Sequence, residues 1–314
     1  MSSLDAHCRL RSPEDLLGAV PFLLGFHPGD SIVAVFIAPD GKVQAVGRAN
    51  LDDSTSEIIA QFRAVLAGQD ISHVALMGYG THTNGRVLND ILRGLRRDAA
   101  ILCGLWVSED EYRCVWDGCA CLAAHGVPFD PRATVSAATL TAQGHVAAMS
   151  RAAVVAELAA DRAAQAVVLA AIEQQNDRPA SFTVADALQV AERGERLDDV
   201  QAAALASLLR QPQAREQAWL ATDDQPWQRQ LWFDLTRRVP DSHAGPVATL
   251  AAWWAWRTGN EVLAVEALRR ALDSDPHSGF TRTIATLITA KIDPAGLPWP
   301  LSPDEATIAL RARA

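Results

Sequence analysis

The sequence predicts a protein in two parts, an α/β first half built on a mixed sheet with covering helices and an all-α second half. Short β-branched and aromatic segments separated by turn residues characterise residues 1–133, a pattern typical of strands joined by loops and helices. From residue 134 onward the chain consists mainly of Ala, Leu, Glu, Gln and Arg, which are strong helix formers. We therefore expect an α/β domain over residues 1–133 and a helical domain over residues 134–314.

The first predicted elements are a helix and a β-hairpin. Ser12 is a suitable N-cap and Pro13 suits the first helical position, so we expect a helix to begin there. The segment 25–31 contains Gly and Pro and ends this helix. Residues 32–37 are β-branched and aromatic, residues 42–51 alternate between polar and apolar, and turn residues separate them. This pattern indicates a hairpin.

The rest of the first half alternates helices and strands. Ser54 and Glu57 form a capping box that begins a helix running to about residue 67, where Gly68 is suited to a left-handed end. The apolar segment 73–77 predicts a strand buried on both faces of a sheet. A further helix and two further strands are expected over residues 86–99, 101–107 and 112–116. This order implies a mixed sheet covered by helices.

One stretch of the helical half has the spacing of a tetratricopeptide-like helix pair, in which small residues let two helices approach closely. The positions with this spacing are Ala255, Gly259, Ala264, Leu268, Ala271 and Pro276. A single such pair cannot bury its own apolar face, and repeat arrays need about three units for stability. Two interpretations remain open, namely ordinary packing in a helical bundle and a partner-binding surface of repeat type.

Tryptophan is concentrated in the same half of the chain. Trp253, Trp254 and Trp256 share one predicted helix. Positions so close in sequence cannot all lie on one narrow stripe of a helix, so we expect some of these indoles to face outward. Clustered aromatic residues usually belong to a core, but because Trp is enriched at protein interfaces these three residues are also the candidate protein interface.

Several segments together carry a resemblance to a known family. They comprise residues 10–17, 20–31, 76–80, 114–128 and 150–151, and the stretch from Trp232 to Pro276. In these segments the chain resembles an actinobacterial family of domains of unknown function, number four-one-nine-two among such domains. Relatives have two adjacent cysteines followed by proline, whereas here Ala120 separates Cys119 from Cys121. The resemblance implies a bacterial cytosolic protein and carries no established activity.

Charge and composition limit the classes of partner. With 28 basic and 37 acidic residues the net charge is −9, which disfavours general nucleic-acid binding. We find no apolar run near the ~18 residues of a membrane helix and no signal peptide, so we expect no membrane association and a cytoplasmic location. Five cysteines, an odd number, fit reduced thiols in that compartment.

Four residues that could act as soft metal ligands lie close together, and they are Cys114, Cys119, Cys121 and His125. Zinc sites usually combine two short ligand pairs separated by a longer loop, a spacing that these residues do not have. The sequence therefore favours buried structural cysteine, with a metal site and a redox thiol as weaker alternatives. It identifies no cofactor.

Two polar segments are candidates for a small-ligand site. The loop 78–85 follows a buried strand, and in open α/β sheets ligands collect at the carboxyl ends of strands. Its glycine spacing matches neither a dinucleotide fingerprint nor a phosphate loop. The segment 26–31 carries His, Asp and Ser without a nucleophile elbow, and a tight turn is its competing interpretation. The candidate ligand-binding residues are His27, Asp30, Ser31, Tyr79, Thr81, His82 and Asn84.

Two functions of different classes follow from these observations. We favour a non-enzymatic interaction, scaffold or regulatory protein that binds another protein or a second copy of itself, because no catalytic motif is visible. The alternative is an enzyme or small-ligand-binding protein that takes an anionic metabolite or nucleotide in loops of the α/β half. The alternative requires the segment 26–31 and the loop 78–85 to lie together, and it fails if they lie at opposite edges of the sheet.

Overall fold

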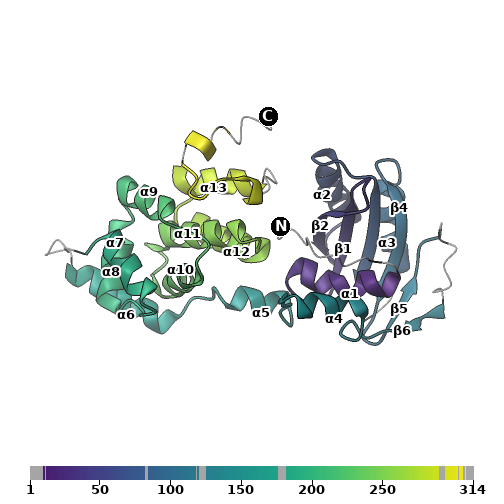
Figure 1. Cartoon of the computed structure of the whole chain (residues 1–314), viewed down its shortest axis with the longest axis horizontal. Helices are drawn as coiled ribbons and strands as arrows, with labels where there is room; N and C mark the ends of the chain where they lie inside the picture. The colour runs from purple at the N-terminus through teal and green to yellow at the C-terminus, as the bar shows by residue number, and fades with distance from the viewer. Residues whose placement is uncertain are drawn as a thin grey trace. The chain divides into compact units, whose positions relative to one another are not determined.

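The computed structural model describes residues 10, 12–81, 84–117, 119, 125–175, 182–289, 294–302, 304–306 and 308. The chain forms two compact units, one ending at Arg151 and the other beginning at Ala152. All strands of the described residues belong to the first unit, and the second consists of helices (Figure 1). The predicted fold class, a mixed sheet with covering helices followed by a helical half, is confirmed.

The first unit is built on a six-stranded sheet with the order β2-β1-β3-β4-β5-β6. Strands β3 and β4 are parallel, and the other neighbouring pairs are antiparallel. The elements are α1 (Pro13–Leu24), β1 (Ser31–Ile37), β2 (Val43–Asn50), α2 (Thr55–Ala67), β3 (His73–Tyr79), α3 (Gly85–Leu95), β4 (Ala100–Val107), β5 (Glu111–Cys114), β6 (Val127–Pro128) and α4 (Val135–Ala142). The sequence does not predict β6, because two residues carry no periodic signal.

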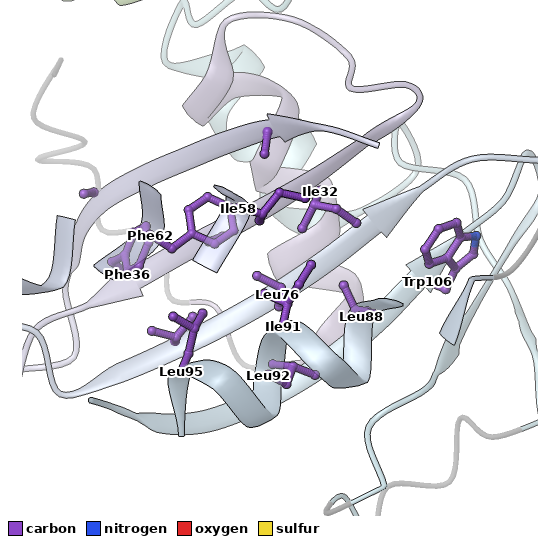
Figure 2. Close-up of a cluster of buried hydrophobic side chains, with 14 residues drawn as sticks. Ile32, Phe36, Ile58, Phe62, Leu76, Leu88, Ile91, Leu92, Leu95 and Trp106 are labelled. Atoms are coloured by element: carbon purple, nitrogen blue, oxygen red, sulfur yellow. The ribbon is translucent and has the colours of Figure 1, made fainter. Parts of the chain in front are cut away.

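The two faces of the sheet pack against different helices. Successive residues of a strand point to opposite faces, so β1 and β3 contribute to two hydrophobic cores. On one face Ile32 and Leu76 pack with Phe62 of α2 and Leu92 of α3 (Figure 2). On the other face Val33, Val35, Ala75 and Met77 pack with Leu16, Leu17 and Val20 of α1. The near-complete burial of β1 and β3 follows from their position between these two layers.

Helix ends in this unit largely follow the local sequence signals. The Ser12 hydroxyl accepts a hydrogen bond from the backbone N–H of Asp15 at 3.2 Å, and the capping box of Ser54 and Glu57 is present. The expected left-handed end at Gly68 is wrong, since this residue has φ −94° and its N–H donates to the carbonyl of Val65. The helix therefore ends in a tightened right-handed turn, which glycine is not needed to form.

Helix α4 packs closely on α1, although the sequence places it in the second domain. A Cβ atom on Gly18 of α1 would lie 1.9 Å from Thr134 Oγ1 and 2.7 Å from Ser136 Oγ. Thr134 is the N-cap of α4 and accepts from the backbone N–H of Ala137 at 3.1 Å. The compact first unit therefore continues to Arg151. The sequence did not indicate this, because helix propensity does not reveal which core a helix will cover.

The second unit is a helical assembly around α11. Helix α5 (Arg151–Ala156) spans the division between the units, and the others are α6 (Arg162–Gln175), α7 (Val184–Glu192), α8 (Asp199–Leu208), α9 (Pro212–Leu220), α10 (Pro226–Arg238), α11 (Ala244–Arg257), α12 (Glu261–Ser274), α13 (Gly279–Thr289) and the 3-10 turn η2 (Pro294–Gly296). None of the helices in the described part of the chain combines the length and apolarity needed to cross a membrane.

The repeat-like helix pair is present as α11 and α12. The two helices are joined by a turn in which Gly259 has φ +83°, a conformation that favours glycine. Ala255, Ala264 and Ala271 are fully buried, which lets α11 and α12 pack closely. Helices α10 and α13 also pack on α11, so the pair is part of a larger helical core.

Replacing Gly18 by Ala is expected to destabilise the protein by about 1–3 kcal/mol, because an added methyl group overpacks the contact between α1 and α4. Gly68→Ala is the control, since its nearest atoms would be 3.7 Å away and its φ is negative, and we expect it to stabilise by about 0.4–1 kcal/mol. Urea unfolding of the full chain, followed by circular dichroism, measures both changes. Equal stability of the two variants would contradict the tight α1 and α4 contact.

Candidate functional site

A cleft of about 320 Å³ lies at the carboxyl ends of the parallel strands β3 and β4. Helix α1, the segment before β1 and the segment after β6 complete its lining. Its polar side chains are those of His27, Asp30, Tyr79, Thr81, Ser108 and Glu109. This is the position where ligands bind in open α/β sheets.

The strand register brings the two predicted polar segments together. Strand β3 runs to Tyr79, two residues beyond the predicted end, and pairs antiparallel with β1 so that Ser31 lies opposite Tyr79. The segment before β1 therefore meets the segment after β3 at the cleft. Indole Nε1 of Trp106 donates to the carbonyl of Gly80 at 3.2 Å and fixes the chain just after β3. The expectation that Gly78 and Tyr79 belong to a loop is wrong.

Gly78 is a strand residue because of a neighbour on β4. A Cβ atom at this position would lie 2.4 Å from the ring of Trp106, whose indole is fully buried. Only glycine leaves room for that indole across the strand. The glycine that reads as a loop signal in the sequence is thus required by packing between two strands.

Two hydroxyl groups beside the cleft are buried without a hydrogen-bond partner among the described residues. They belong to Ser31, which is fully buried, and Tyr79, which is 8% exposed and lines the cleft. Because residues opposite each other in an antiparallel pair project to the same face, both side chains lie on the α1 side of the sheet. Burial raises the pKa of Tyr79, so its hydroxyl stays protonated and can donate. Buried hydroxyls without a partner are uncommon and point to an ordered water or a ligand.

His27 reaches the cleft from a segment held by backbone hydrogen bonds. Its N–H donates to the carbonyl of Ala148 at 2.9 Å, and the N–H of Ala148 donates to the carbonyl of Gly25 at 2.9 Å. Burial, and secondarily the positive charge of Arg132, lowers the pKa of His27. Its imidazole is therefore neutral near pH 7 and offers one donor and one acceptor.

Two carboxylates line the cleft from different segments. Asp30 has φ +40°, a left-handed conformation that Asp tolerates better than most residues, and its carbonyl accepts from the N–H of Leu51 at 3.1 Å. Glu109 follows β4 and is exposed, as is Asp30. The lining also includes an apolar wall formed by Leu17, Pro21 and Phe129. The cleft thus combines negative charge with apolar surface.

Of the remaining predicted ligand-binding residues, only one lies at the cleft within the part of the chain that the structure describes. Thr81 lines the cleft and is exposed. Asn84 is the N-cap of α3 and accepts from the backbone N–H of Val87 at 3.4 Å, which explains its residue type without a ligand. His82 lies outside the described residues. Sequence reasoning missed Ser108 and Glu109, although they follow the strand parallel to β3 and the same strand-end rule applies to them.

The cysteine segment provides no assembled metal site in the part of the chain that the structure describes. Cys114 ends β5 and is half-buried, Cys119 is half-buried, and His125 is exposed. Cys121 lies outside the described residues. No group of three His, Cys, Asp or Glu side chains that could hold a metal occurs among the described ones.

The three candidate interface tryptophans are buried in the helical unit. Trp253 is fully buried, and Trp254 and Trp256 are 8% and 5% exposed. Trp253 packs edge-on against Trp219, with ring centroids 5.4 Å apart. The expectation that some of these indoles face outward is wrong, because α10, α12 and α13 pack around α11 and leave it no solvent-facing stripe. These side chains therefore offer very little surface to a partner.

Comparison with known proteins gives a match that extends over both units. A family model described as "Domain of unknown function (DUF4192)" matches residues 13–295. Membership of the family expected from the sequence is thereby confirmed. No curated protein matches the chain, and no solved structure does.

Trp253→Ala is expected to lower the free energy of unfolding by about 3–5 kcal/mol, because it removes a fully buried indole and leaves a cavity. Val265→Ala on α12 is the control, since this side chain is 44% exposed and its loss should change stability by less than about 0.5 kcal/mol. Denaturant unfolding of both variants gives the comparison. A stable Trp253→Ala protein would contradict the buried position of this residue.

His27 is expected to titrate below the ordinary histidine pKa, and Arg132→Gln is expected to raise the pKa of His27 part of the way back. The rise is partial because burial is the larger cause of the shift. Arg63→Gln on α2, which covers the opposite face of the sheet, should leave this pKa unchanged. An NMR titration of the His27 ring protons, assigned with His27→Gln, measures the effect. An ordinary His27 pKa in the unsubstituted protein would contradict its burial at the cleft.

Proposed function

The chain belongs to the DUF4192 family of domains of unknown function. From the geometry of the cleft, we propose that it is a non-enzymatic, regulatory protein whose α/β unit binds a small molecule there. The observation that carries this proposal is the register of β1 and β3. It brings the segment containing His27 and Asp30 beside Tyr79 and Thr81 at one cleft. This is the arrangement that the ligand-binding alternative requires.

The size and composition of the cleft support a small ligand. Its volume of about 320 Å³ is at the lower end of small-molecule sites, which span roughly 300–1,000 Å³. It combines an apolar wall with a few polar groups, as such sites generally do. An unsatisfied buried hydroxyl costs about 1–3 kcal/mol, so the orphan hydroxyl of Tyr79, a residue that lines the cleft, favours binding of a hydrogen-bonding partner.

Binding is proposed rather than catalysis because of the contacts among the cleft side chains. An activated nucleophile is normally held by a hydrogen bond to a base, which a third group orients. Within the described residues, no such hydrogen bond joins His27 to a hydroxyl or thiol of the cleft. The proposal also includes a protein partner for the helical unit and a location in a bacterial cytosol. The tryptophans of α11 do not support the protein partner, because they are buried.

A thermal-shift screen of metabolites and nucleotides tests the function, with Gly29→Phe as the blocked variant. Gly29 lines the cleft, and a Cβ atom there meets nothing within 4 Å, so the backbone at this position has room for the start of a side chain. A ligand at one hundred times its Kd stabilises the protein by about 2.7 kcal/mol, an effect that Gly29→Phe should abolish. Gly279→Phe, at a similarly open glycine of α13, should retain it.

The proposed function fails if no compound stabilises the protein, or if stabilisation persists unchanged in Gly29→Phe. Turnover of a stabilising compound would show that the protein is an enzyme and would overturn the non-enzymatic assignment.

A further inference from the structure

The charges around the cleft are unbalanced. Asp30 and Glu109 approach it from the segments before β1 and after β4. Neither carboxylate takes part in an ion pair or a side-chain hydrogen bond with the described residues. Surface carboxylates without partners are common, but here two of them line the same hollow as an apolar wall.

The histidine of the cleft supplies no compensating positive charge. His27 is the basic side chain of the lining, and burial together with Arg132 keeps its ring neutral. Arg132 itself is exposed and does not line the cleft, and its guanidinium lies 3.8 Å from Met149 Sδ. A ligand in the cleft therefore meets more negative than positive charge.

The apolar wall and the orphan hydroxyl define the rest of the ligand. Leu17, Pro21 and Phe129 offer a surface suited to a ring or a short aliphatic chain. Tyr79 is more than nine-tenths buried, lines the cleft and has no partner for its hydroxyl among the described residues. The site thus combines uncharged hydrogen-bonding groups, among them the orphan hydroxyl of Tyr79, with two carboxylates and an apolar face.

We propose that the ligand is a small organic cation, with a protonated amine held near Asp30 and Glu109 and an apolar group against Phe129 and Leu17. This inference rests on the proposed function and narrows it to a ligand class. It replaces the anionic metabolite or nucleotide expected from the sequence, because an anion would enter a cleft that two carboxylates line. A metal ion is a poorer fit, since the described residues offer no group of three suitable ligands.

A matched series of three probes tests the sign of the ligand charge. The probes are 2-phenylethylamine, 2-phenylethanol and 3-phenylpropanoate, which share an aromatic ring and differ in charge. Binding to the full chain is followed by backbone amide NMR shifts, which report both the affinity and the location. Since two unit charges interact by about 1 kcal/mol at contact even in water, we expect the amine to bind at least about tenfold more tightly than the carboxylate at low salt.

Carboxylate variants distinguish an effect of the two cleft carboxylates from an effect of the protein's overall negative charge. The double variant Asp30→Asn with Glu109→Gln should remove the preference for the amine. Asn is among the few residues that tolerate the left-handed backbone of Asp30, so the fold should be retained. Asp70→Asn is the control, because this exposed carboxylate precedes β3 at the opposite end of the strand and does not line the cleft. It should leave the preference unchanged.

The outcomes distinguish this inference from the proposed function. Cleft shifts with equal or tighter binding of the carboxylate overturn the inference and leave small-molecule binding in place. A preference for the amine that survives the double variant also overturns it. If none of the three probes shifts the cleft residues, the inference fails, and the screen with Gly29→Phe decides separately whether the proposed function fails with it.

Discussion

The first unit depends on the position of β3 between β1 and β4. Each of its backbone groups must find a partner, because the strand is buried on both faces and has no access to water. Pairing with β1 sets the register in which Ser31 lies opposite Tyr79, and pairing with β4 makes the carboxyl ends of two parallel strands adjacent. A slip of one residue would turn Tyr79 from the α1 face to the face of α2 and α3. The cleft, its hydroxyls and both hydrophobic cores therefore share one constraint.

Local signals in the sequence were sufficient for much of the fold. The caps at Ser12 and Ser54 act within one helical turn, so the residues that decide them are adjacent in the sequence. The end of β3 could not be predicted in this way. Gly78 belongs to the strand because the indole of Trp106, from a neighbouring strand, occupies the space of a side chain. The packing of α4 on α1 could not be predicted from local signals either, because the residues in contact, Gly18 and Thr134, are far apart in the chain.

The candidate site was partly predictable because strand ends carry a sequence signal. Tyr79 and Thr81 line the cleft, as the rule for the carboxyl ends of strands in open sheets predicts. His27 and Asp30 precede β1, and they reach the same cleft because β1 is antiparallel to β3. Glu109 was missed because its contribution depends on the order of strands in the sheet, which the sequence did not supply. The tryptophans of α11 show the opposite error, since an argument from a single helix assumes a solvent-facing side that a central helix does not have.

Trp106 connects the two faces of the sheet near the cleft. Its ring belongs to the core beneath α2 and α3, whereas its Nε1 donates to Gly80, which lines the cleft. Any movement of the chain after β3 must therefore lengthen or break a hydrogen bond to a buried indole. The side chain that fills the core beneath α2 and α3 thereby also holds the segment that lines the cleft, so the core and the cleft are coupled through one residue.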